Sequence, residues 1–308
     1  MRILLATDHR YPARRGGSAA SRIVDTIAKG LAELGHTVFY QVRGGLAEAL
    51  PEGVIYVSER RYDVDIFHLQ DGVRTDRADT RGKPWVRTIH APPNPDDDGS
   101  ELVGDNWIFV SASHARSYGK KRYVLNGIDP AEFIFSETKQ DYFLFVVAGL
   151  ERAELKGLQV VQALVDQLAI ELVIAGYSRD KSYERRFAAM CKEKGIRFTG
   201  GVHGREKAEL IAGARGLLAP SVVAESCPLV IEEALMSGTP VICSNKGACP
   251  ELVTPDVGFV CATQQDYEEA VARIGEISPG VCRAKAVKEF HYRRMAADYV
   301  KEYEKSRS

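Results

Sequence analysis

At 308 residues, the chain is long enough for two domains of about 150 residues each, rather than for a single core. The composition is 45% hydrophobic and 27% charged, and the formal net charge of -1 excludes the basic field that attracts nucleic acid. No apolar run reaches the ~18 residues of a membrane-spanning helix, and the start MRILLATDHR is typical of a first strand rather than a signal peptide.

The first half of the chain predicts a parallel sheet covered by helices. An apolar strand at 2–7 is followed by a loop with Gly16-Gly17 and then by apolar residues at helical spacing up to Gly35. Strand, helix and strand joined by short links are the pattern of such a sheet. Further strands are predicted at 36–42, 53–57, 64–69, 85–89 and 107–111.

The second half repeats this pattern after a polar stretch at 130–140. A strand at 142–149 is followed by alternating helices and strands up to residue 244. The last helix is predicted over 283–305, with Phe290, Met295, Tyr299 and Tyr303 on its buried face. The predicted fold is therefore α/β, with two Rossmann-like, doubly wound parallel-sheet domains facing across a cleft.

Cysteine and aspartate usage give no sign of a metal site. The six cysteines lie in the second half and form no CxxC pair. Without a signal peptide, reduced thiols are the default, so we predict a cytoplasmic protein and leave peripheral membrane association open. The run Asp96–Asp98 is interpreted as a solvated loop.

Candidate ligand-binding residues follow the strands, because ligands of open parallel sheets bind outside the carboxyl ends of the strands. Gly16-Gly17 either brings the backbone close to an anion or forms a plain turn. Lys156, with Arg152 in the same loop, either reaches a phosphate or is a solvated surface charge. His90 either bonds a hydroxyl or carbonyl group or caps a strand edge.

The stretch ESCPLVIEEALMSG holds two glutamates around a predicted helix start. Glu225 follows the strand that ends at Pro220-Ser221, and Glu233 lies in the helix. The backbone N–H groups between them are donors suited to a pyrophosphate, and a carboxylate accepts two O–H bonds from a sugar diol. The spacing fits a nucleotide-sugar, but it fits an amphipathic surface helix as well. Glu232 is predicted to be solvated.

These residues resemble the retaining glycosyltransferases of family 4, which have the GT-B fold. The family hallmark is a glutamate, seven residues and a second glutamate followed by alanine, which here are Glu225 and Glu233-Ala234. The resemblance extends over nearly the whole chain. Its motifs here are Pro220-Ser221, GTPV at 238–241, PELV at 250–253, FTG at 198–200, TIH at 88–90 and NGID at 126–129.

The resemblance implies a hexosyltransferase that moves a sugar from a nucleotide-diphosphate sugar of the UDP or GDP type to a hydroxyl acceptor. The acceptor is a saccharide, a lipid-linked group or a small molecule, and no further cofactor is required. It also implies an acceptor-side domain at 1–135, a donor domain at 136–282 and a helix at 283–308 that crosses back to the first domain. We expect a monomer or weak dimer.

The resemblance also assigns roles to single residues. Glu225, His90 and Lys156 are expected to be catalytic, and Glu233 is expected to bind the ribose of the donor. Val202 is expected near the base. The remaining donor-binding residues are expected to be Gly16, Gly17, Gly149, Arg152, Ser226, Cys227, Pro228, Leu229 and Val230.

One departure from the family lies in the loop before Lys156. The family has glycine followed by arginine there, whereas Gly149 is followed by Leu150, and the loop is longer. Either Arg152 replaces the missing charge or nothing does. This departure keeps a catalytically inactive nucleotide-sugar-binding protein open beside the transferase. An epimerase, which needs no acceptor, and a phosphorylase, which holds a pyridoxal cofactor, are also open.

Overall fold

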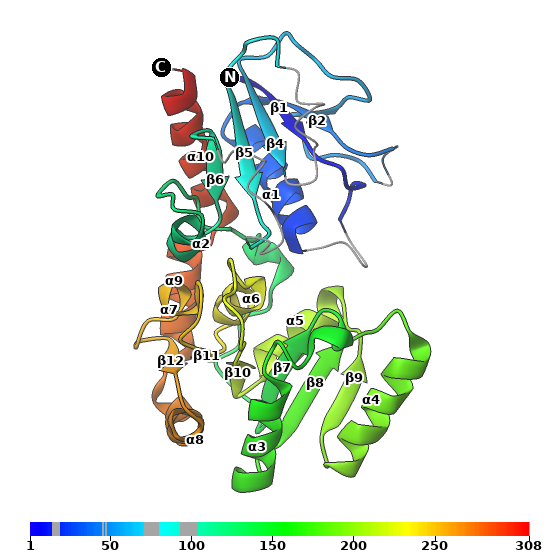
Figure 1. Cartoon of the computed structure of the whole chain (residues 1–308), viewed down its shortest axis with the longest axis vertical. Helices are drawn as coiled ribbons and strands as arrows, with labels where there is room; N and C mark the ends of the chain where they lie inside the picture. The colour runs from blue at the N-terminus through cyan, green and yellow to red at the C-terminus, as the bar shows by residue number, and fades with distance from the viewer. Residues whose placement is uncertain (14–18, 45, 47, 71–79, 93–103, 308) are drawn as a thin grey trace. The chain divides into compact units, whose positions relative to one another are not determined.

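The computed structural model describes residues 1–308 except 14–18, 45, 47, 71–79, 93–103 and 308. Gly16, Gly17 and the run Asp96–Asp98 therefore lie outside the described residues. The described chain forms two compact units (Figure 1). The first unit is Met1–Asp129 with Glu289–Ser308, and the second is Pro130–Lys288.

The first unit is built on a six-stranded parallel sheet. Its strand order is β3-β2-β1-β4-β5-β6. The strands form where the sequence has short apolar runs, and β4 is buried along its whole length. The strands are β1 (Arg2–Ala6), β2 (Thr37–Gln41), β3 (Val54–Tyr56), β4 (Ile66–Gln70), β5 (Trp85–Ile89) and β6 (Trp107–Phe109).

Helices α1 (Ala19–Glu33), α2 (Ala112–Ser117) and α10 (Tyr292–Arg307) belong to the first unit. Helix α10 packs against α1 and β5. The side chains of Phe290, Met295, Tyr299 and Tyr303 are fully buried, as the helical spacing predicted. Burial of such side chains stabilises a unit by roughly 1.5–3 kcal/mol each, so the end of the chain is part of this core.

The single helix predicted over 283–305 is wrong. The structure has two helices here, α9 (Pro279–Glu289) and α10, with a break at Phe290 and His291. His291 pairs with Ile128 in a short parallel bridge. The amide of Ile128 donates to the Phe290 carbonyl at 2.8 Å, and this bond to another segment interrupts the helix.

The second unit is also a six-stranded parallel sheet, with the order β12-β11-β10-β7-β8-β9. Numbered from its own first strand, each sheet has the order 3-2-1-4-5-6, which is the Rossmann order. The predicted α/β class with two Rossmann-like sheets is confirmed. The strands are β7 (Phe143–Val147), β8 (Leu172–Gly176), β9 (Arg197–Gly200), β10 (Gly216–Ala219), β11 (Val241–Ser244) and β12 (Gly258–Cys261).

Helices cover the second sheet, and its core lies around β7, β8 and α3. The strand order changes direction between β7 and β10, so the loops after these two strands flank the switch point. The other helices are α3 (Leu158–Leu168), α4 (Lys181–Glu193), α5 (Gly204–Gly213), α6 (Leu229–Met236), α7 (Cys249–Leu252) and α8 (Gln264–Arg273). Short 3-10 turns lie at Pro130–Glu132, Leu150–Arg152 and Ile274–Glu276.

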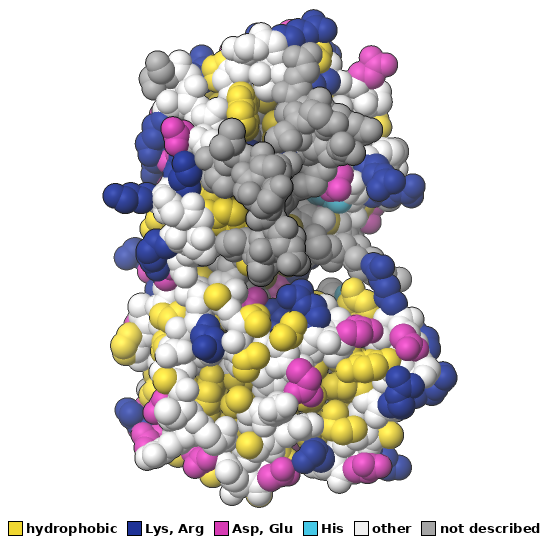
Figure 2. All heavy atoms as spheres, viewed as in Figure 1, with side chains coloured by type: hydrophobic (Ala, Val, Ile, Leu, Met, Phe, Trp, Pro, Cys, Tyr) yellow, Lys and Arg dark blue, Asp and Glu magenta, His cyan; other side chains and the backbone are white. Residues whose placement is uncertain are grey.

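The visible surface of the second unit carries basic and acidic side chains side by side (Figure 2). This mixture agrees with the nearly balanced formal charge of the sequence. Among the helices that the structure describes, none is long and apolar enough to pass through a bilayer. The six cysteines are free thiols.

Candidate functional site

Two loops at the switch point of the second sheet are joined by hydrogen bonds. One loop follows β7 and contains Leu155, and the other follows β10 and begins at Pro220. The Leu155 carbonyl accepts from the Val222 amide at 3.0 Å and from the Ser221 hydroxyl at 3.2 Å. The sequence placed candidate residues on both loops, and these bonds hold the loops together.

Gly157 explains how the two loops approach so closely. It has a φ of 91° and precedes α3. A Cβ atom at this position would lie 2.1 Å from the carbonyl oxygen of Pro220, so no other residue fits without movement of the backbone. The glycine therefore fixes the place of Lys156, the residue before it.

Lys156 and Glu225 form an ion pair across the two loops. The Ser221 hydroxyl donates to the same carboxylate at 2.7 Å. The lysine side chain is 25% exposed and the glutamate side chain 14%, so both remain accessible to a ligand. The structure thus brings together Lys156 and Glu225, the two second-unit residues for which the sequence predicted catalytic roles.

The backbone of Glu225 is held by the segment after β11. The Ala248 amide donates to the Glu225 carbonyl at 2.9 Å. A Cβ atom on Gly247 would lie 2.4 Å from both the amide nitrogen and the carbonyl oxygen of Glu225. This close backbone contact, which the sequence analysis missed, fixes the position of the carboxylate.

Glu233 forms a second, more buried ion pair. Its side chain is 1% exposed, and its carboxylate lies 2.5 Å from the ammonium group of Lys207 on α5. Lys207 was not predicted. Val202, predicted near a base, is buried just before the same helix, so Val202 and Lys207 belong to one connection after β9.

The predicted solvation of Glu232 is wrong. This side chain is fully buried, and its carboxylate accepts from the Cys227 thiol at 3.2 Å. Glu232 lies in the first turn of α6, where a negative charge is favoured by the helix dipole. The reason for its burial is that α6 packs against α5, α7 and the sheet, and nearly all of its residues are buried.

The segment between the two glutamates leads into α6. Ser226, Cys227, Pro228 and Val230 are half-buried and Leu229 is buried. Pro228 occupies the N-cap position. The first-turn N–H groups of a helix have no acceptor within the helix and attract anions. The segment therefore offers backbone donors at a positively polarised helix end.

The departure in the loop after β7 has a structural explanation. Leu150 is fully buried and belongs to the core cluster of the second unit. Gly149, just before it, has a φ of 119°. Arg152 is exposed to solvent. The position that carries arginine in the resembled family is thus used for packing.

His90 belongs to the first unit and directly follows β5. It is half-buried, and its Nε2 atom lies 3.0 Å from the Oε1 atom of Gln70, the last residue of β4. Both side chains therefore lie at the carboxyl edge of the first sheet.

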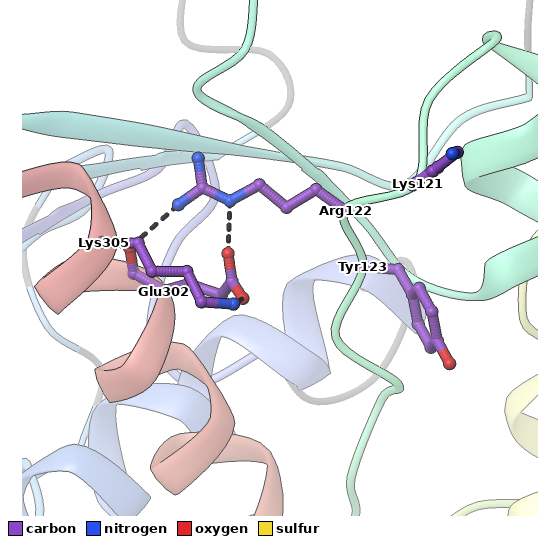
Figure 3. A pocket seen from close by; sticks show the side chains of 5 residues that line it. All are labelled: Lys121, Arg122, Tyr123, Glu302 and Lys305. Carbon is purple, nitrogen blue, oxygen red and sulfur yellow. Dashed lines mark hydrogen bonds and ion pairs between the residues drawn. The ribbon is translucent and has the colours of Figure 1, made fainter.

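An open pocket lies elsewhere on the first unit (Figure 3). This open pocket of about 470 Å³ is lined by Lys121, Arg122, Tyr123, Glu302 and Lys305. Arg122 and Lys305 both donate to the Glu302 carboxylate, and Lys121 adds a third cation to the lining. The lining of this pocket includes none of the predicted site residues. Within the described residues, no cluster of histidine, cysteine and carboxylate side chains is suited to a metal ion.

Comparison with known families identifies the second unit. Residues 130–281 match the family model of the glycosyl transferases group 1. These residues are therefore a glycosyltransferase group 1 domain, which belongs to a class of sugar-transferring enzymes. The match covers the switch-point loops and both lysine–glutamate pairs.

One curated relative is the MMP alpha-(1->4)-mannosyltransferase of Mycolicibacterium hassiacum. It is 35% identical over 123 residues, which are 36% of this chain and 29% of that protein. The alignment thus spans less than a third of the relative and supports homology over the aligned residues alone. The substrates of the relative are stated for that protein only.

Solved structures share the fold over the whole chain. AviGT4, a glycosyltransferase involved in avilamycin A biosynthesis, is 22% identical with a TM-score of 0.79, covering 100% of this chain and 98% of its own. Sucrose-phosphate synthase from Thermosynechococcus elongatus is 18% identical with a TM-score of 0.77, covering 99% and 98%. HepE of Anabaena in complex with UDP is 15% identical with a TM-score of 0.74, covering 98% and 99%. These likenesses confirm the predicted GT-B fold class.

Proposed function

We propose that the protein is a retaining glycosyltransferase that moves a sugar from a nucleotide-diphosphate sugar to an acceptor hydroxyl. The observation that carries this proposal is the pair of lysine–glutamate contacts, Lys156–Glu225 and Lys207–Glu233, on either side of the segment leading into α6. They lie in a glycosyltransferase group 1 domain. A solved neighbour of the same fold binds UDP, which supports a nucleotide donor.

The donor is proposed to lie along the segment from Ser226 to Val230. Glu233 accepts hydrogen bonds from the ribose hydroxyls, and Val202 contacts the base. Glu225 accepts from hydroxyls of the transferred sugar. Because both carboxylates are ion-paired and little exposed, their positions are set before the donor arrives, which lowers the cost of ordering them.

Lys156 is proposed to stabilise the leaving group. As the bond between the sugar and the diphosphate breaks, negative charge grows on the departing phosphate. The ammonium group of Lys156 and the N–H groups at the start of α6 are donors for that charge. Preorganised donors of this kind contribute about 3–4 kcal/mol each to stabilisation of the transition state.

The first unit is proposed to supply the acceptor side, with His90 near the sugar and the acceptor hydroxyl. The domain roles follow the resemblance, with residues up to about 135 on the acceptor side and 136–282 on the donor side. In this proposal the anomeric configuration of the sugar is retained. The glutamate pair, shared with a retaining family, supports that stereochemistry.

The proposal is tested in two measurements. Thermal shifts against UDP, GDP, UDP-glucose and GDP-mannose identify the donor, because a ligand at 100-fold excess over its dissociation constant stabilises the folded state by about 2.7 kcal/mol. Proton NMR of the anomeric signal of the product then gives the stereochemistry. No shift with any of these nucleotides contradicts donor binding, and an inverted product contradicts the retaining assignment.

A further inference from the structure

A run of hydrogen bonds connects helix α10 to His90 through the interior of the first unit. It begins at Tyr303 of α10, whose hydroxyl lies 2.7 Å from the Nδ1 atom of His68 on β4. Both side chains are fully buried. They are separated by 235 positions in the sequence, so only the fold brings them together.

Gln70 carries the run from His68 to His90. Its amide nitrogen lies 2.9 Å from His68 Nε2, and its amide oxygen lies 3.0 Å from His90 Nε2. An amide nitrogen only donates and an amide oxygen only accepts. Therefore His68 Nε2 accepts a hydrogen bond, and His90 Nε2 carries a proton and donates it.

A second branch closes around His68. The Thr88 hydroxyl on β5 lies 2.7 Å from His68 Nε2 and 3.0 Å from the Tyr299 hydroxyl. The ring centroids of Tyr299 and His68 are 4.7 Å apart. His68 is thus enclosed by polar partners from two strands and one helix, and its ring cannot turn without breaking several bonds.

Such a network is an unusual use of core volume. Apolar residues would pack these positions without the desolvation cost that buried polar groups carry. A fully bonded polar network gives one rigid arrangement in return. One explanation is that the network only fixes the docking of α10. However, the amide oxygen of Gln70 contacts His90, which lies at the edge where ligands of such sheets bind.

We infer that Gln70, His68 and Tyr303 are positioning residues for His90. They hold the imidazole of His90 with a proton on Nε2, which donates to the amide oxygen of Gln70. The inference rests on the role of His90 in the proposed function.

The direct test is the tautomer of His90, read from the ¹⁵N chemical shifts of its ring in the full-length protein. We expect the Nε2–H form in the unmutated chain. Gln70→Met removes both amide contacts at similar volume, and Tyr303→Phe removes one hydroxyl. Both should move His90 toward a mixture of tautomers, Gln70→Met more strongly.

Tyr292→Phe is the matched control. Tyr292 also lies on α10, but its hydroxyl donates to Glu33 on α1 and takes no part in the run. This variant should leave the His90 shifts unchanged. If Gln70→Met does not fold, Tyr303→Phe, which lacks a single oxygen atom, gives the same comparison with Tyr292→Phe.

The kinetic readout is hydrolysis of UDP-glucose or GDP-mannose, whichever binds. Gln70→Met should lower kcat roughly tenfold, because small errors in position cost up to a hundredfold, while KM for the donor changes less than about twofold. Unchanged His90 shifts in both variants, or an Nδ1–H form in the unmutated chain, would overturn the inference. A shifted tautomer with unchanged kcat would uphold the positioning and contradict the role of His90 in the proposed function.

Discussion

Two regions at the carboxyl edges of the sheets differ in charge although the sheets share one strand order. The edge of the second sheet carries ion pairs, Lys156–Glu225 and Lys207–Glu233. Near the ends of β4 and β5 in the first sheet, His68, Gln70 and His90 form a hydrogen-bonded network of imidazole and amide groups. The fold therefore does not set the chemistry of an edge. The side chains on the loops and strand ends do.

The contrast suggests a division of labour. Fixed cations and helix donors suit the diphosphate, whose charge grows during the reaction. Neutral groups that fix a tautomer suit a hydroxyl group, which must be oriented before it reacts. Variants of the ion-paired residues in the second unit and of His68 in the first unit test this contrast.

The largest expected effect is on the loop contact that positions Lys156. Gly157→Ala should destabilise the second unit by about 2–5 kcal/mol, because left-handed strain adds to the collision with Pro220. Gly195→Ala is the control. Gly195 also has a positive φ, but a Cβ there would meet nothing within 4 Å, so about 1 kcal/mol is expected. Urea unfolding measures both, and equal losses would show that the contact with Pro220 does not matter.

The next effect concerns the buried carboxylate. Lys207→Ala leaves Glu233, which is 1% exposed, without its ion-pair partner, and should cost about 3 kcal/mol of unfolding free energy. Lys181→Ala breaks the exposed pair with Glu184 and should cost less than about 1 kcal/mol. A Lys207→Ala variant as stable as Lys181→Ala would mean that Glu233 does not need its cation.

The sequence predicts those residues of this site that a local pattern marks. Lys156 and Glu225 were predicted because each follows an apolar strand, and parallel strands bring such loops to one edge. Lys207 was missed because it lies 26 positions from Glu233 on another helix and resembles any surface lysine. The only available signal was its position shortly after Val202, which was predicted to lie near the base.

Two other features needed tertiary contacts. Glu232 was predicted to be solvated because it adjoins Glu233, but α6 is enclosed by other elements on nearly all sides. The break between α9 and α10 has neither proline nor glycine to mark it. It arises from the pairing of His291 with Ile128, which is distant in the sequence.

A smaller effect should appear in the pH dependence of the free energy of unfolding of the first unit. Burial, with His90 nearby, lowers the pKa of His68 to about 3, whereas in the unfolded chain its pKa is near 6.5. Below pH 6.5 the unfolded state takes up a proton that the folded state does not, so stability falls as pH falls. The slope is about 1.4 kcal/mol per pH unit, or about 2 kcal/mol by pH 5.

His68→Gln removes the titrating group and should flatten this part of the pH profile. Unfolding should be followed with a separate probe in each unit. The pH dependence contributed by His68 should then appear in the first unit alone. An unchanged slope in His68→Gln would show that His68 is not held neutral by the fold.

The smallest effect is expected for Arg152. Its side chain is exposed, so Arg152→Ala should change donor affinity by less than about threefold. Lys156→Ala, at the other end of the loop, should change the transfer rate far more. If Arg152→Ala slows transfer as much as Lys156→Ala, the exposed arginine replaces the charge missing at Leu150.

The central claim is that Glu225 and Glu233 bind opposite ends of one donor, and calorimetric titration of UDP and GDP tests it most directly. Glu233→Gln should weaken nucleoside diphosphate binding tenfold to over a hundredfold, because charge-assisted bonds to the ribose contribute about 1.5–3 kcal/mol. Glu225→Gln should bind the diphosphate as the unmutated chain does, yet transfer sugar slowly. Glu209→Gln, in an exposed pair with Arg205 on α5, is the control and should behave as the unmutated chain. Loss of diphosphate binding in Glu225→Gln, or full binding in Glu233→Gln, would contradict the account.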